Sequence, residues 1–173
     1  MLKLLLKIVL SLTSTLSLAD YKRADWPHWK DLDGDCQNAR VEILIRDNIG
    51  ELTYKTDREC KVISGLWMLP YKGGIEKNPR NIDIDHIIPL KWAHNNGGAN
   101  WSRAQKKAFA NDPENLLATT ATANRQKGAK GPEAWIPFIN RCSYGIRWQY
   151  LLTKYELNAP STTLKAIESL CSY

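Results

Sequence analysis

The hydrophobic pattern changes twice in the N-terminal half of the chain. The first 19 residues are rich in apolar side chains, interrupted by two lysines and by several serines and threonines. Residues 36–48 carry apolar positions that fit the period of a helix and of a strand alike, and we predict a helix from their alanine, glutamate and leucine content. Between residues 52 and 71 β-branched and aromatic side chains predominate, which predicts strands. Glycines and a proline in residues 73–79 then indicate a loop.

The central part of the chain reads as strand, insertion, strand and helix. The first strand carries Asp83 to Pro89, and the second runs over residues 113–119. In the insertion between them, Ser102 is placed to cap a short basic helix that extends through Ala110. Residues 120–127 suit a helix that stops at Gly128.

The last third of the chain is predicted to be helical. Aromatic and leucine side chains recur at helical spacing from Trp148 to Tyr155, which favours a buried packing face. Pro160 and Ser161 end that helix and start another. Strands and helices in this order predict an α+β fold, organised as one domain of about 154 residues over 20–173.

The apolar run at the N-terminus has the pattern of a cleaved secretory signal. Lys3 and Lys7 give a positive start, and the run ends in Ser17-Leu18-Ala19, with small residues where a signal peptidase cuts. A membrane anchor is the alternative, but the run is short and interrupted by serines and threonines. We therefore expect a signal peptide over 1–19, no stable membrane insertion after its removal, and a secreted or periplasmic protein.

Charge indicates the kind of partner. The formal net charge is +6, and it falls to +4 when the two lysines of the signal are removed. A moderately basic exported protein suits an anionic partner, which is nucleic acid or a membrane surface.

The four cysteines fit export to an oxidising compartment. An even set in such a chain predicts disulfides, and no close cysteine–histidine cluster supports a zinc site instead. Four cysteines allow three pairings. We favour Cys36–Cys60 with Cys142–Cys171, because each pair closes a local loop on its own side of the central segment.

The central segment carries residues suited to activating a water molecule and binding a divalent metal. A neutral imidazole deprotonates water near pH 7, and His86 is the candidate base. Asp85 and Asn124 offer hard oxygen ligands that suit Mg²⁺ or Mn²⁺. One geometric condition applies: Asp85 and His86 point to opposite faces of a regular strand, so the strand must end, twist or bulge there. Pro89 favours an early end.

Several motifs together resemble a known nuclease family. The run D-x-D-H-I-x-P, an asparagine before the second strand and N-R-x-K-G on the following helix resemble the ββα-metal finger of HNH endonucleases. The segments DGDCQNAR, FANDPENL and P-x-x-W resemble small secreted nucleases related to the C-terminal domain of modification-dependent restriction enzymes. The similarity spans nearly all of the mature chain.

The resemblance implies a fold and a set of roles. The fold is a ββα-metal core over about residues 81–131, with surrounding helices, a small N-terminal sheet and disulfides. His86 would be the base, Asp85 and Asn124 would hold one metal ion, and Asn115 would brace the hairpin behind His86. Asp83 is a possible outer partner of the metal ligands. Three further residues receive no assigned role: Arg40, Glu42 and His94.

Basic residues gather around the same motifs. Between residues 101 and 131 six cations face two carboxylates, a local charge of +4. This concentration suggests a groove that follows a phosphate backbone. Arg125, Lys127 and Lys130 are the predicted phosphate contacts, while the lysines of the preceding insertion are expected to be solvated.

These observations predict an exported metal-dependent endonuclease that cleaves DNA, and possibly RNA, with little sequence specificity. The alternatives are an exported nucleic-acid-binding protein that does not cut and a disulfide-bonded interaction module. The motifs do not decide between single- and double-stranded substrate, and they leave the oligomeric state open, with a monomer favoured.

Overall fold

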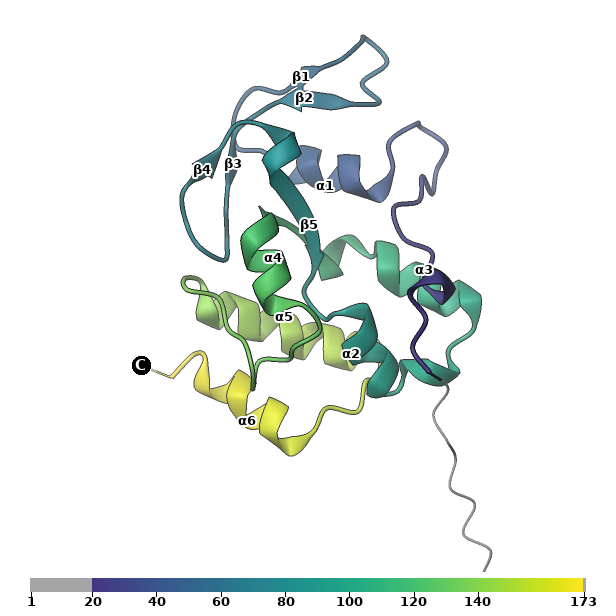
Figure 1. Cartoon of the computed structure of the whole chain (residues 1–173), viewed down its shortest axis with the longest axis vertical. Helices are drawn as coiled ribbons and strands as arrows, with labels where there is room; N and C mark the ends of the chain where they lie inside the picture. The colour runs from purple at the N-terminus through teal and green to yellow at the C-terminus, as the bar shows by residue number, and fades with distance from the viewer. Residues whose placement is uncertain (1–19, 173) are drawn as a thin grey trace, which may run out of the picture.

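The computed structural model describes residues 20–172 (Figure 1). The predicted signal peptide lies outside the described residues. Within the described part, no helix is long and apolar enough to cross a membrane. The α-helices are α1 (Ala39–Arg46), α2 (Leu90–Asn95), α3 (Arg103–Asn111), α4 (Ala121–Lys127), α5 (Arg141–Lys154) and α6 (Ser161–Ser169). The strands are β1 (Thr53–Tyr54), β2 (Val62–Ser64), β3 (Trp67–Met68), β4 (Ile75–Glu76), β5 (Ile82–His86) and β6 (Leu116–Thr120).

Strands β5 and β6 pair antiparallel and lead directly into α4. The register runs from Ile82 opposite Thr120 to His86 opposite Leu116. Thr120 ends β6 and caps α4, because its hydroxyl accepts a hydrogen bond from the Ala123 amide at 3.1 Å. Gly128 ends the helix at a φ of +54°, which favours glycine. The predicted order of strand, insertion, strand and helix is therefore present.

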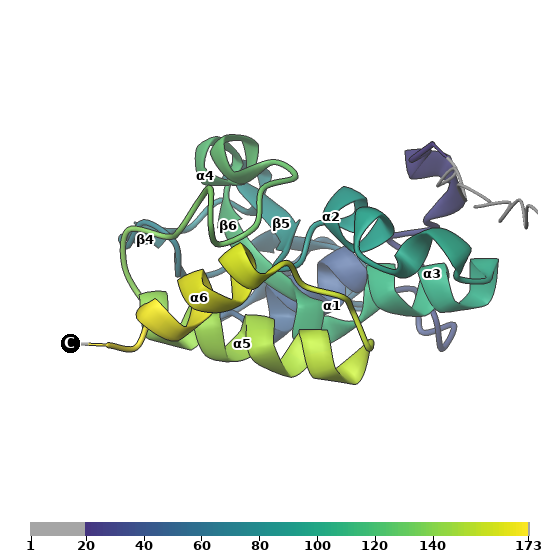
Figure 2. The ribbon, with the colours of Figure 1, turned by 90° about the horizontal axis from the view of Figure 1, so that it is seen from below.

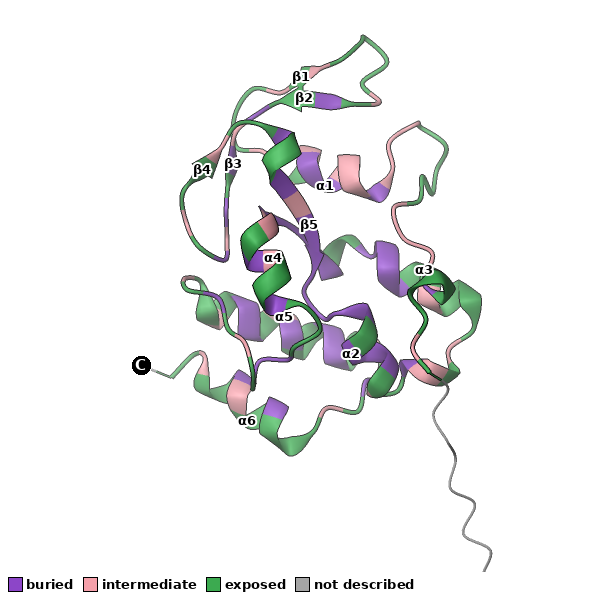
Figure 3. Cartoon of the chain, viewed as in Figure 1, coloured by how far each residue is buried: buried purple, intermediate pink, exposed green. Residues whose placement is uncertain are grey.

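Alternation along β5 divides the interior into two apolar clusters. Ile82 and Ile84 point toward α1 and pack in a cluster with Ile43 and Leu44. Leu117 of β6 belongs to the other cluster, which includes side chains of α2, α3 and α5. Figure 2 shows α4 on one side of the hairpin and α1 on the other, and Figure 3 shows that β5 is buried along most of its length. The hairpin is the layer on which both clusters assemble.

The N-terminal region contains the predicted helix and short strands. Asn38 caps α1 by accepting hydrogen bonds from the amides of Arg40 and Val41. The expected small sheet is instead two separate hairpins, β1–β2 and β3–β4. Trp67 of β3 packs onto α1 and donates from Nε1 to the Leu44 carbonyl at 2.7 Å. Trp67 therefore ties the β3–β4 hairpin to α1, and the two hairpins do not form one continuous sheet.

The insertion and the C-terminal third are helical. Helix α3 begins at the predicted cap, where Ser102 and Gln105 form a reciprocal capping box. The preceding helix α2 was not predicted. Helices α5 and α6 confirm the C-terminal prediction, and Gly145 lets them approach closely, because a Cβ there would lie 3.2 Å from a Leu170 methyl group.

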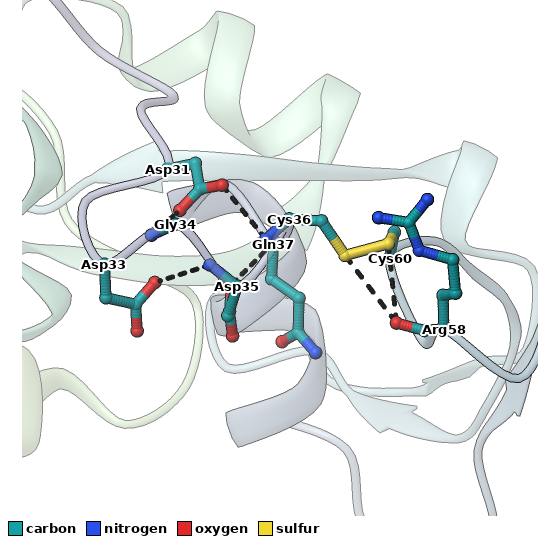
Figure 4. Close-up of a disulfide and its surroundings, with 8 residues drawn as sticks. All are labelled: Asp31, Asp33, Gly34, Asp35, Cys36, Gln37, Arg58 and Cys60. Carbon is teal, nitrogen blue, oxygen red and sulfur yellow. Dashed lines mark hydrogen bonds between the residues drawn. A yellow bond between two sulfur atoms is a disulfide. The ribbon is translucent and has the colours of Figure 1, made fainter.

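Two disulfides confirm the favoured pairing: Cys36–Cys60 and Cys142–Cys171. The first joins the loop before α1 to the loop after β1, where Asp31 and Asp35 shape the chain by accepting backbone amide hydrogen bonds (Figure 4). The second joins Cys142, in the first turn of α5, to Cys171, just after the end of α6. Both bridges lie in the flanks, and neither crosses the β5–β6 hairpin.

The Cys142–Cys171 bridge should supply much of the stability of the C-terminal pair. We expect the double substitution Cys142→Ser/Cys171→Ser to lower the free energy of unfolding by about 3–4 kcal/mol, because an open loop of this length has more conformational entropy when unfolded. Urea unfolding at equilibrium measures the change. A protein carrying only Ser143→Ala is the control, and a double variant as stable as the oxidised protein would contradict the expectation.

Candidate functional site

The end of β5 brings Asp85 and His86 to one cavity. Asp85 lies opposite Leu117 and faces α4, whereas His86 lies opposite Leu116 and faces the α1 side. The geometric condition set by their alternation is met because β5 ends at His86. Both residues, together with Asn124 of α4, line a cavity of about 320 Å³.

His86 is held in one tautomer. Its Nε2 lies 2.9 Å from the carbonyl oxygen of Ala110 in α3, and because a carbonyl only accepts, Nε2 carries the hydrogen. The imidazole is 5% exposed, and the Trp29 ring lies against it with a centroid distance of 5.7 Å. Burial lowers the pKa of His86 to about 3. The neutral ring thus presents Nδ1 as the atom that can accept a proton.

The segment FANDPENL builds the surroundings of His86. Ala110 supplies the carbonyl, and Asn111 holds the segment that carries Trp29 by accepting from the Lys30 amide and donating to the Pro27 carbonyl. Asn115 lies where the bracing role requires: its backbone carbonyl accepts from Ile87, and its side chain bonds both the amide and the carbonyl of Ile88. These bonds hold the chain immediately after His86.

Asp85 belongs to a buried ion pair. Nζ of Lys127 lies 3.0 Å from Oδ2 of Asp85, and the same ammonium donates to the backbone carbonyl of His86 at 2.7 Å. The hydroxyl of Tyr71 donates to Asp85 at 2.8 Å. Burial raises the pKa of the Asp85 carboxyl and lowers the pKa of the Lys127 ammonium, and each charge opposes the shift of the other.

The place of Lys127 corrects one prediction. The sequence placed it among the phosphate contacts, yet its side chain is fully buried. In an N-R-x-K-G helix, the residue three positions after Asn124 lies on the face that packs on β5, so the ammonium points inward. Lys127 therefore contacts the protein interior, while Arg125 and Lys130 of the same motif are exposed.

Asn124 is oriented by Asp83. Its Nδ2 donates to Oδ2 of Asp83 at 3.0 Å, so Asp83 contacts the predicted ligand Asn124, and its role as an outer partner of the metal ligands stays a prediction. The amide oxygen of Asn124 is then the ligand atom available at the cavity. Oxygens from Asp85 and Asn124 at one cavity, with the Asp83 carboxylate behind them, form a donor set that fits a hard divalent cation. A cation that bound Asp85 would share that carboxylate with Lys127.

Several contributors escaped the sequence analysis. Tyr71 had no motif around it. It lies in the turn between β3 and β4, and its hydroxyl contacts Asp85 because that turn packs close to β5. Arg23 and Lys91 line the cavity but lie outside the recognised motifs. Arg40, to which no role was assigned, donates to the carbonyls of Pro79 and Ile82 and so fixes the start of β5.

Comparison with known proteins now decides the family. Residues 38–158 match the model of the C-terminal domain of GmrSD restriction endonucleases, a span of well over half of the chain. The chain belongs to this family. Its GmrSD-type region begins at the cap of α1 and includes the candidate base, the oxygen donors and the bracing asparagine, whereas α6 lies beyond it.

A similar protein is found in a fungus. The chain is 36% identical over 154 residues to a protein of Arthroderma benhamiae named "Uncharacterized secreted protein", covering 87% of this chain and 74% of the relative. The aligned length exceeds the span 38–158 of the family match, so the two proteins are similar beyond that segment.

The buried ion pair predicts that substituting two nearby lysines will change the free energy of unfolding by very different amounts. Lys127→Met should lower the free energy of unfolding by about 3–5 kcal/mol, because it leaves the Asp85 carboxylate buried without its partner. Lys130→Met is the matched control on the exposed side and should change stability by less than about 0.5 kcal/mol. Chemical denaturation measures both.

A further variant checks the cause of this loss. Asp85→Leu in the Lys127→Met background removes both charges and should recover most of the stability. Equal stability of the Lys127→Met and Lys130→Met proteins would instead mean that the Lys127 ammonium reaches solvent.

Proposed function

We propose that this protein is an exported, metal-dependent endonuclease whose site is the β5–β6–α4 unit, acting as a ββα-metal core of the HNH type. One observation carries the proposal: His86, fixed in a neutral tautomer, shares a cavity with the oxygen donors Asp85 and Asn124. Membership of a family named for restriction endonucleases supports the reaction class.

His86 acts as the general base. Its Nε2–H is held by the Ala110 carbonyl, so Nδ1 takes the proton from the attacking water. Burial lowers the pKa of His86 and so keeps the ring uncharged, with a free lone pair on Nδ1, before reaction. The hydrogen bonds from Asn115 to Ile87 and Ile88 hold the end of β5, and with it His86, in place while the water is activated. Asn115 is thus a positioning residue.

Asp85 and Asn124 would hold one Mg²⁺ or Mn²⁺ ion, with Asp83 orienting Asn124. When bound, the ion supplies positive charge that stabilises the phosphate and the leaving 3′-oxygen. Lys127 and Tyr71 hold the Asp85 carboxylate in a fixed orientation toward the cavity. The reaction leaves a 5′-phosphate on the product.

The substrate is nucleic acid, with DNA as the first choice, and the contacts fall on its backbone. Arg23 and Lys91 line the cavity, and Arg125 and Lys130 are exposed and directly follow the lining residues Asn124 and Ala129 in the sequence. Cations distributed in this way bind phosphates without reading bases, which supports cleavage with little sequence specificity.

Export from the cell is part of the proposal. The signal-like N-terminus, two disulfides and a similar protein named as secreted all support an extracellular or periplasmic location. The protein then belongs to a small secreted subgroup of its family and acts as a monomer.

The base is tested by plasmid degradation with the oxidised mature protein. We expect cleavage with Mg²⁺, none with EDTA, and a loss of at least about 100-fold in rate for His86→Gln, which keeps a donor for the Ala110 carbonyl but accepts no proton from water. His86→Ala should lose activity equally. Both variants should bind DNA in EDTA as the parent does.

Other outcomes of this experiment have distinct meanings. Salt-sensitive DNA binding without cleavage under several divalent metals would replace the nuclease by a non-catalytic nucleic-acid-binding protein. A His86→Gln protein that cuts at the parental rate would remove His86 from the base role while leaving the nuclease intact.

The metal ligands are tested without turnover. Calorimetric titration of the metal-free protein with Mn²⁺ should show binding that Asn124→Ala abolishes and Asp83→Ala weakens by about 10–100-fold, since Asp83 orients the ligand. Thr122→Ala, an exposed change on the same helix, is the control. Unchanged Mn²⁺ affinity in Asn124→Ala would contradict the ligand role.

A further inference from the structure

A second hollow lies on the other flank of α4 from the candidate site. It has a volume of about 440 Å³, in the range of small-molecule pockets. Its walls come from the turn at Tyr71, the Thr122–Gln126 side of α4 and the segment from Trp135 to Phe138. These three parts of the chain meet beside the start of α5 (Figure 1).

The hollow has a fixed aromatic wall that faces solvent. Phe138 is 77% exposed, although its backbone amide is anchored by a 2.8 Å hydrogen bond to the Tyr71 carbonyl. Trp135 packs edge-on against Tyr71 with ring centroids 5.0 Å apart. An anchored loop that presents an aromatic ring to water offers a stacking surface for another flat group.

The polar side chains around the hollow narrow the choice of ligand. Lys72 and Arg141 bring positive charge, and Gln126 brings an amide that both donates and accepts. Among the described residues that line the hollow, none carries a carboxylate. A flat ring with a hydrogen-bonding edge and an attached negative charge matches all three features, and a nucleotide has this chemistry.

Tyr71 joins the hollow to the candidate site. Its ring is part of the wall, and its hydroxyl donates to Asp85 at 2.8 Å. A group in the hollow is therefore one tyrosine side chain away from the carboxylate proposed to hold the metal.

We propose that the hollow binds a nucleobase of the substrate strand, adjacent to the phosphate that is cut. This proposal rests on the proposed function and extends it to the substrate class. A base stacked in a duplex is not available to a pocket, so it must be unpaired or flipped out. The preferred substrate is then single-stranded or locally unpaired nucleic acid.

The experiment compares binding of three fluorescent ligands in EDTA: a short single-stranded DNA, the same backbone with abasic sites, and the blunt duplex. The parent protein should bind the single strand about tenfold more tightly than the abasic strand, the effect of one stacked base. Phe138→Ala should remove this preference and Phe138→Trp should retain it. Ile146→Ala, an equally apolar and 61% exposed position on α5, should behave as the parent.

The outcomes separate the two proposals. Equal binding of the abasic and intact strands by the parent protein would overturn the base pocket, and so would an unchanged preference in Phe138→Ala. If the protein still cleaved plasmid with Mg²⁺, the proposed nuclease activity would stand. A dimer in sedimentation that Phe138→Ala dissociates would assign the hollow to a second copy of the chain and overturn the base pocket. Absence of both DNA binding and cleavage would overturn both proposals.

Discussion

The fold of the central unit depends on a charge that has no access to water. The Lys127 ammonium is fully buried, and such a group is tolerated only when other groups replace its hydration. Asp85 supplies the opposite charge and the His86 carbonyl supplies a further acceptor. Both acceptors lie at the end of β5, so the pair docks α4 onto that end and determines how helix and hairpin are oriented.

The same constraint explains why two neighbouring residues have different surroundings. Asp85 faces a polar network of Lys127 and Tyr71, whereas His86 faces the carbonyl of α3 and the ring of Trp29. Strand alternation separates the two side chains, and the end of the strand lets both reach one cavity. A carboxylate and an uncharged imidazole are thus adjacent in the sequence, with different hydrogen-bond partners for their side chains.

The elements with strong local signals were predictable. Ser102 and Thr120 are helix caps, Gly128 is a helix stop, and the segments around them formed where expected because capping is a local interaction. Helix α2 lacks a side-chain cap and follows Pro89, so it had no such signal. The division of the N-terminal strands into two hairpins depends on tertiary contacts with α1, which a single sequence does not display.

The candidate site was predictable only where residue type and motif agreed. His86 and Asn124 line the cavity as the motifs indicated, although their roles stay predictions. The inward direction of Lys127 could have been noticed from its helical position relative to Ala123, since residues four apart share a face. The contributions of Tyr71 and Arg23 come from parts of the chain far from the motifs, and nothing in their local sequence indicates the contact.

The positions of the disulfides have a consequence for a protein exposed to proteases. Each bridge closes on its own flank, so no covalent link other than the backbone connects residues 36–60 with residues 142–171. A single cut within either loop leaves one covalently joined molecule. A single cut between them yields two fragments held only by packing, and that unbridged stretch contains His86, Asn115 and Asn124. The stretch that carries the candidate base and the candidate metal ligand is therefore the part that neither disulfide holds together after a single cut.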